Sequence, residues 1–390
     1  MPSHYFVFRT AKLEYSRQCS CRITELVLLD GGYHASSMKQ TAAATLCVLI
    51  LSITVAFFHF PDVLLVGSIT EDVIGGEIHL GGAVSYAAAV SASLGKRACV
   101  VYSARPDSSP RLFTEDHVAH VVPANATLTF EHSYTYFGEL DWWQVLSLAE
   151  YKYIMPGWSN YGHGDFAGNH RKLRVVAEPD VKLSWEHVPF RCRWAKTILL
   201  GPLTQNDVDV ESFVRQDALQ RTARTLIGKP RFGIMGQGLQ RQLDQTGMVG
   251  TMPEPSIELI RALTKDVTVF LSDVETDPWP KPRLEEVVAK SKRVFITRGR
   301  DGADEYIFNG TLTSQNHMSH PVQKVIDTNG AGDSFATAYM LAESTGYPSP
   351  AYFANFVASI IVTLPQNCKP KCIQQDNILR NASMSLSSGK

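Results

Sequence analysis

The chain has 390 residues, of which 44% are apolar and 19% charged, the composition of an ordinary globular protein with ample core. Its formal net charge of −1 excludes the basic surface that is typical of nucleic-acid-binding proteins. Seven cysteines are scattered along the chain, and their odd number indicates reduced thiols in an intracellular protein rather than a disulfide framework. Cys368 and Cys372 are close in sequence, but one pair is only half a zinc site, and we interpret both as surface thiols.

Residues 1–60 are predicted to be an extension that precedes the globular domain. The stretch Thr41–Phe58 is uncharged and largely apolar, close to the roughly 18 residues that a membrane-spanning helix needs. Three interpretations stay open: a membrane anchor, a targeting leader, or sequence that does not belong to the mature protein. We therefore expect a cytoplasmic or organellar protein, in which membrane anchoring is possible only through residues 41–58.

The globular part opens with a strand–helix–strand pattern. Val63–Val66 is a short apolar run typical of a buried strand, and Ala83–Leu94 is a helix rich in small residues that ends at Gly95. Cys99–Tyr102 is the next strand. This order predicts a parallel sheet.

The remaining pattern extends the same architecture. Further buried strands are predicted at residues 198–202, 232–235, 267–271 and 294–297, and helices at 256–264, 284–291 and 350–364. Asn309-Gly310 between two strand-like runs predicts a hairpin. Residues 72–80 and 126–138 are expected to form a small β-lid, and residues 366–390 a polar tail.

The most informative stretch is Asp327–Phe335, which reads Asp-Thr-Asn-Gly-Ala-Gly-Asp-Ser-Phe. Apolar residues precede it and a helical pattern follows, so we predict a strand-to-helix turn whose glycines let backbone amides surround an anion. Asp333 in the first helical turn would suit the deprotonation of a hydroxyl beside a phosphate. The alternative is a glycine-rich turn in which Asp333 only caps the helix.

These nine residues resemble the C-terminal signature of the ribokinase-like (PfkB) sugar and nucleoside kinases. The resemblance implies that Asp333 is the catalytic base and that Gly330, Ala331 and Gly332 form an anion hole. It also implies that Asp327 helps to position a monovalent cation such as K⁺. The expected fold is a three-layer α/β/α sandwich with a mostly parallel sheet and a small β-lid, spanning residues 61–365.

The sequence lacks the P-loop and the dinucleotide-binding glycine motif, so another element must hold the nucleotide. Thr297, Gly299 and Gly302 resemble the family's T-x-G-x-x-G element near ATP, and Asn355 matches the asparagine by the adenine pocket. Glu275 matches the glutamate that organises Mg²⁺ through water, although Ser272 stands where the family has asparagine. A solvated glutamate at a strand end is the alternative for Glu275.

On the acceptor side, the resemblance implies that Asp72 binds substrate hydroxyls and that Gly81 and Gly82 let the substrate lie against the backbone. Thr70 and Ser85 stand where many sugar kinases carry asparagine. The acceptor is therefore not expected to bind as ribose binds to a standard ribokinase.

The predicted function is transfer of a phosphoryl group from ATP, with Mg²⁺, to an alcohol group of a sugar, polyol or nucleoside. The alternative is a catalytically weak, kinase-like regulator or ligand sensor. The predicted partners are small molecules rather than nucleic acids, with the lid as a candidate homodimer surface.

Overall fold

The computed structural model describes residues 9–12, 22–25, 60–108, 117–135, 170–215, 229–376 and 378–381. Contacts divide the chain into two units, Met1–His59 and Phe60–Lys390. In the first unit, strand β1 (Arg9–Lys12) pairs with antiparallel strand β2 (Arg22–Glu25). The apolar stretch 41–58 lies outside the described residues, and the boundary predicted near residue 60 stays a prediction. Within the described ranges, no helix is both long and apolar enough to cross a membrane.

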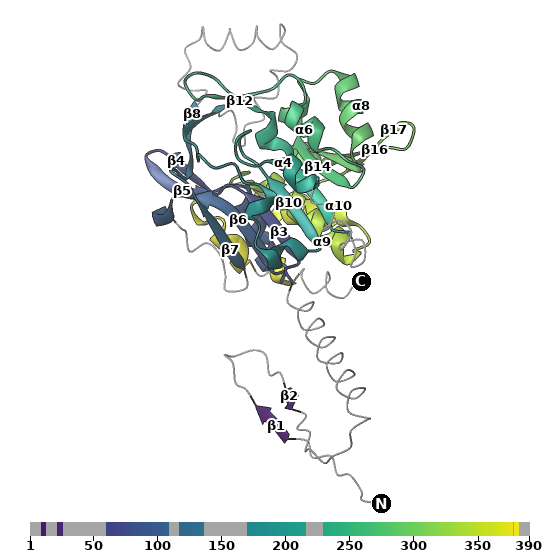
Figure 1. The fold of residues 1–390 in the computed structure, drawn as a ribbon. Helices are drawn as coiled ribbons and strands as arrows, with labels where there is room; N and C mark the ends of the chain where they lie inside the picture. The colour runs from purple at the N-terminus through teal and green to yellow at the C-terminus, as the bar shows by residue number, and fades with distance from the viewer. Residues whose placement is uncertain are drawn as a thin grey trace, which may run out of the picture. The chain divides into compact units, whose positions relative to one another are not determined.

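The second unit is built on a nine-stranded sheet (Figure 1). Its strands, in spatial order, are β17 (Leu312–His317), β16 (Ala303–Phe308), β15 (Arg293–Thr297), β14 (Val267–Ser272), β11 (Arg231–Met235), β10 (Thr197–Gly201), β3 (Val63–Gly67), β6 (Ala98–Ala104) and β7 (Val118–Pro123). Every pair of neighbours from β15 to β7 is parallel, and β16 is antiparallel to both of its neighbours. The predicted parallel sheet and the hairpin at Asn309-Gly310 are confirmed.

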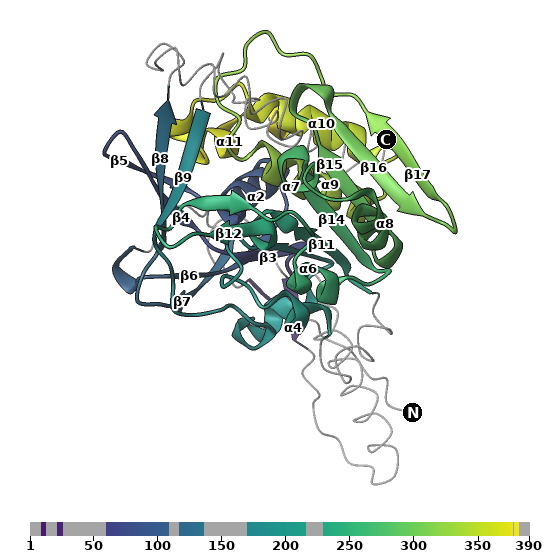
Figure 2. The ribbon, with the colours of Figure 1, turned by 90° about the horizontal axis from the view of Figure 1, so that it is seen from above.

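Helices cover both faces of this sheet (Figure 2). One face carries α2 (Ala83–Ser93), α9 (Ala331–Thr345), α10 (Pro350–Ile361) and α11 (Lys371–Gln375), and the other α4 (Val210–Val214), α6 (Ile257–Ala262) and α8 (Lys281–Lys290). Successive residues of one strand serve the two layers: Leu65 of β3 belongs to the first core and Leu64 to the second. The predicted three-layer α/β/α sandwich is confirmed.

A second, four-stranded sheet forms the lid. It consists of β5 (Glu77–Gly81), β4 (Thr70–Ile74), β8 (Leu128–Thr135) and β9 (His170–Ala177). Strand β4 follows β3 after only Ser68 and Ile69, so the lid is joined directly to a strand of the main sheet. The mostly polar sequence of β9 gave no strand signal, because its conformation comes from pairing with β8.

The predicted strand before the glycine motif is wrong. No strand or helix is assigned between His317, the last residue of β17, and Ala331, the first of α9, and Val325 and Ile326 are 38% and 37% exposed. The Ile326 amide donates to the main-chain oxygen of Val362 at 2.8 Å, just beyond α10. An apolar run becomes a strand only where a neighbouring strand is available, and here the neighbour is a helix end.

Two disulfides contradict the expectation of reduced thiols. Cys99 of β6 bonds Cys192 of η5 (Phe190–Trp194), and Cys368 bonds Cys372. Cys99 and Cys192 are 93 residues apart in sequence. Spacing therefore gave no sign of the pair, because the fold alone brings strand β6 and η5 together.

The residues after 365 are not only a polar tail, contrary to the prediction. They contain η8 (Gln366–Cys368) and α11, and the side chains of Ile373 and Leu379 are fully buried. The Ser93 hydroxyl of α2 donates to the main-chain oxygen of Ile373. The few apolar side chains in this polar stretch form no periodic pattern, so the sequence did not show this packing.

We expect Ile373→Ala to lower the free energy of unfolding by about 2–5 kcal/mol, because it removes a fully buried side chain and leaves a cavity. Ile378→Ala is the matched control, because Ile378 is 56% exposed, and it should change the stability by less than about 0.5 kcal/mol. Chemical denaturation measures both. Equal stabilities of the two variants would contradict the docking of α11.

Candidate active site

A cavity of about 280 Å³ lies between the lid and the carboxyl ends of the parallel strands. Lid residues such as Thr70, Asp72 and His132 line one side, and residues at or after β10, β11, β14 and β15 line the other. The carboxyl ends of the strands in an open α/β sheet are where such folds bind ligands. The turn at residues 328–333 completes the lining.

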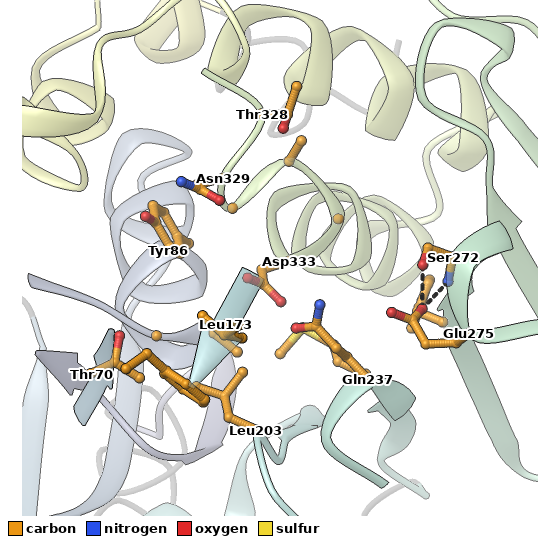
Figure 3. A pocket seen from close by; sticks show the side chains of 18 of the residues that line it. Thr70, Tyr86, Leu173, Leu203, Gln237, Ser272, Glu275, Thr328, Asn329 and Asp333 are labelled. Carbon is orange, nitrogen blue, oxygen red and sulfur yellow. Dashed lines mark hydrogen bonds between the residues drawn. The ribbon is translucent and has the colours of Figure 1, made fainter. Parts of the chain in front are cut away.

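Asp333 lies in the first turn of α9, and its side chain points into the cavity (Figure 3). Helix α9 is buried without interruption from Ser334 to Ala342. Its Phe335 and Tyr339 rings pack on Phe295, with ring centres 5.5 and 4.5 Å apart, and Phe295 stacks on Phe270 at 5.6 Å. This aromatic cluster fixes the rotation of α9, and with it the direction of Asp333.

The surroundings of Asp333 favour its neutral form. Burial among protein atoms raises the pKa of Asp333, Arg241 lowers it and the Glu275 carboxylate raises it, so that the pKa is about 6. A carboxylate with a pKa near 6 is still mostly ionised at neutral pH but is a stronger base than an ordinary aspartate. These are the properties of a general base.

The turn before Asp333 depends on one glycine. Gly330 adopts a left-handed conformation with φ of 78°, and a side chain there would clash with the Tyr86 ring of α2. The Ala331 amide donates to the main-chain oxygen of Thr328 at 3.1 Å, so it closes the turn, which differs from its expected place in the anion hole. The amides of Gly332 and Asp333 lie in the first helical turn, where the helix itself provides no acceptor.

Asp327 lies behind this turn and is not part of the cavity lining. One carboxylate oxygen accepts a hydrogen bond from the Asn329 amide at 3.1 Å, and the other lies 3.1 Å from the buried ammonium of Lys369. The structure therefore places a side-chain cation where the resemblance implied a monovalent ion.

Glu275 lines the cavity and also caps a helix. Its Oε2 accepts hydrogen bonds from the amide and the hydroxyl of Ser272, both at 2.5 Å, at the start of α7 (Asp273–Thr276) (Figure 3). The serine in place of the family's asparagine thus forms a capping box with Glu275. The carboxylate is held at the cavity wall, which fits a glutamate that orders metal-bound water.

On the acceptor side, Asp72 and Gly82 line the cavity and Gly81 does not. A side chain at Gly81 would clash with the Asp72 carboxylate and the Thr70 hydroxyl, so this glycine makes room for Asp72. Asp72 Oδ1 lies 3.6 Å from Nε2 of His132 across the lid sheet. Asp72 is thereby held at the lid surface that faces Asp333.

Of the predicted nucleotide residues, only Thr297 lines this cavity. Gly299 and Gly302 shape the turn between β15 and β16, where a side chain at Gly302 would clash with the backbone at His317. The side-chain Nδ2 of Asn355 donates to the main-chain oxygens of His317 and Met318, at 2.8 and 3.2 Å. A second hollow lies over this loop and is lined by residues 317–321 and Tyr352.

The structure adds residues that the sequence did not single out: Tyr86, His132, Gln237 and Arg241. A single histidine, glutamine or arginine forms no recognisable sequence pattern, so no sequence signal pointed to His132, Gln237 or Arg241. Arg241 Nη1 donates to the main-chain oxygen of Leu203 at 3.0 Å, and its guanidinium lies 5.3 Å from the Phe130 ring centre. Arg241 thus brings a positive charge to a cavity that otherwise holds carboxylates.

Comparison with known proteins agrees with this geometry. Residues 275–372 match the family described as "pfkB family carbohydrate kinase". Over 86 residues the chain is 33% identical to 2-dehydro-3-deoxygluconokinase of Escherichia coli, a match that covers 21% of this chain and 28% of that protein. The chain thus spans less than a third of the curated relative it matches.

Solved structures show the same fold over most of the chain. Adenosine kinase from Sinorhizobium meliloti aligns with a TM-score of 0.55 and 14% identity, covering 83% of this chain and 99% of that one. A pyrophosphate-dependent kinase of the ribokinase family aligns with a TM-score of 0.54 and 16% identity, covering 78% and 96%.

We expect Asp333→Asn to raise the melting temperature at pH 7 to 8, because it removes a carboxylate whose ionisation the folded state opposes. The folded pKa, about 6, lies above the ordinary aspartate value of 3.8, so the carboxylate costs stability in full above pH 6 and nothing below about pH 4. The gain should therefore vanish as the pH falls from 6 to 4. Asp266→Asn, at a largely exposed position, is the control; a pH-independent difference would contradict the raised pKa of Asp333.

Proposed function

We propose that this chain is a ribokinase-like (PfkB) kinase that transfers the γ-phosphoryl group of ATP to a hydroxyl of a sugar, polyol or nucleoside; its fold and the match of residues 275–372 to that family support the proposal. One observation supports this most: a carboxylate with a raised pKa lies in a cavity beside helix amides and opposite a second buried carboxylate. The proposed general base, Asp333, and the proposed acceptor-binding group, Asp72, thus line one cavity.

In the proposed reaction, Asp333 accepts the proton of the acceptor hydroxyl while the oxygen of that hydroxyl forms a bond to the γ-phosphorus. The bond from phosphorus to the bridging oxygen breaks, and ADP leaves. The amides of Gly332 and Asp333, with the positive end of α9, stabilise the negative charge of the transferred group. The lid opposite them excludes water and so limits hydrolysis of the donor.

The nucleotide is proposed to extend from Thr297 and the Gly299–Gly302 turn toward the hollow at residues 317–321, which Asn355 holds in place. Mg²⁺, held by the phosphates and through water by Glu275, supplies positive charge to the phosphate oxygens when bound. Because the similar structures include pyrophosphate-dependent kinases, pyrophosphate is the donor to compare with ATP.

The acceptor is proposed to carry several hydroxyls, since Asp72 can accept two hydrogen bonds from neighbouring hydroxyl groups. Arg241 favours an acceptor that also carries a carboxylate, because its guanidinium charge lies at the same cavity. Sugar acids therefore come first in an acceptor panel, each paired with its neutral polyol. A homodimer through the lid and a cytoplasmic or organellar location remain further predictions.

We expect Asp333→Asn to lower kcat by about 10²–10⁴, the usual contribution of a general base, while the Kd for ATP changes little. For the unmodified chain, kcat/KM should fall as the pH drops through about 6, because protonated Asp333 cannot accept the proton. Coupled ADP-release kinetics measure the rates, and calorimetry measures ATP binding.

An unchanged kcat in Asp333→Asn would remove Asp333 from the base role. Ligand binding without turnover of any donor, over the whole acceptor panel, would favour the alternative of a regulator or ligand sensor.

We expect Asp72→Ala to lower kcat/KM for the acceptor by about 10–100-fold, because it removes a charge-assisted hydrogen bond, whereas the KM for ATP stays nearly constant. Glu77→Ala is the matched control on the same lid, where the Glu77 side chain is 83% exposed. A lower melting temperature with normal acceptor kinetics would assign Asp72 to the scaffold instead.

A further inference from the structure

The Lys369 side chain is a fully buried cation that the proposed reaction does not use. None of its surface is exposed, and its ammonium group contacts three oxygens of one short segment. It donates to the main-chain oxygen of Asp327 at 2.8 Å, to Oδ2 of Asp327 at 3.1 Å and to the main-chain oxygen of Asn329 at 3.1 Å. This segment leads directly into Gly330.

Burying an ammonium group is costly, and it persists only where hydrogen bonds and an opposite charge compensate for the lost water. Here the Asp327 carboxylate supplies the charge and the two carbonyls supply further acceptors. An ammonium group has three N–H donors, and three oxygens surround it. A carboxylate and backbone carbonyls around one point are also the ligand types that hold hard metal cations.

The contacts form a clamp on the turn. Lys369 donates hydrogen bonds to the main-chain oxygens of both Asp327 and Asn329. In addition, Asp327 Oδ1 accepts a hydrogen bond from the backbone amide of Asn329. Asn329 is followed by Gly330, the left-handed residue that packs on Tyr86, and then by the first turn of α9. A shift of the clamp would therefore move the amides of Gly332 and Asp333 and the base itself.

Lys369 comes from a part of the chain beyond the predicted domain. It lies between η8 and α11, flanked by the bonded pair Cys368 and Cys372, and the buried Ile373 anchors the helix that follows. The C-terminal segment is thus attached to the core on one side and to the anion-binding turn on the other.

We propose that Lys369 is a positioning residue that supplies, from within the chain, the cation that orders the anion-binding turn. The enzyme would consequently need no alkali-metal ion, in contrast to the monovalent-cation role expected for Asp327. The inference rests on the proposed phosphoryl transfer, but the cation site itself can be tested without turnover.

The kinetic experiment compares the unmodified chain, Lys369→Ala and Lys371→Ala in buffers whose only monovalent cation is tetramethylammonium. Lys371 is an exposed lysine at the start of α11 and is the matched control. We expect kcat to fall by about 10²-fold in Lys369→Ala, the scale of a roughly 1 Å misplacement of reacting groups, and to stay unchanged in Lys371→Ala.

Small cations should then restore part of the kcat that Lys369→Ala has lost. Added K⁺, ammonium or methylammonium is expected to raise kcat of Lys369→Ala by about tenfold, with a smaller change in either KM, and to leave the other two proteins unaffected. A merely structural lysine would not show recovery by a cation that fits the vacated space. Normal kcat in Lys369→Ala, or strong activation of the unmodified chain by K⁺, would overturn the proposal.

A thermal measurement separates this inference from the proposed function. At equal ionic strength, ammonium chloride should raise the melting temperature of Lys369→Ala relative to tetramethylammonium chloride, and not that of Lys371→Ala. If no donor and acceptor pair is turned over but this stabilisation is seen, the proposed function fails and the cation site stands. Identical melting temperatures in both salts would refute the cation site, whatever the activity.

Discussion

The burial of helix α9 is the constraint on which the rest of the site depends. Phe335 and Tyr339 are locked against Phe270 and Phe295 of the central strands, so the helix has one rotation and one height above the sheet. The N-terminus of α9 therefore lies at the carboxyl ends of the strands, and the Gly332 and Asp333 amides and the Asp333 side chain point toward the lid. The chemistry is placed by apolar packing rather than by contacts among the polar groups.

The surroundings of the polar groups differ, and these differences suit the groups to different roles. Three carboxylates line the same cavity, those of Asp72, Glu275 and Asp333. Glu275 is held by two hydrogen bonds from Ser272, whereas burial and a nearby like charge oppose the ionisation of Asp333. Burial and a nearby like charge both disfavour the charged form of a carboxylate. Asp333 is thus suited to accepting a proton, whereas Glu275 is fixed at the cavity wall by its contacts with Ser272.

The sequence predicted the sheet, the layers and the turn at Gly330–Asp333 because these depend on local pattern: apolar runs, small-residue helices and nine contiguous residues. It missed His132, Arg241 and Lys369, since each is a lone polar residue that reaches the site only through the fold. It also predicted a strand from Val325 and Ile326, because an apolar run does not reveal whether a neighbouring strand exists. The binding roles of Asn355 and Gly81 stay predictions; the structure shows that Asn355 supports a loop and that Gly81 makes room for Asp72.

The bond between Cys99 and Cys192 ties the outer helical layer to a core strand that ends near the lid. A crosslink over a loop of this length lowers the conformational entropy of the unfolded chain, which stabilises the folded state by about 4–5 kcal/mol in the entropic description. That contribution exists only where the surroundings keep the bond oxidised. The resistance of this domain to unfolding is thus coupled to the redox potential around it, and a thiol reductant in a buffer would alter the protein as well as protect it.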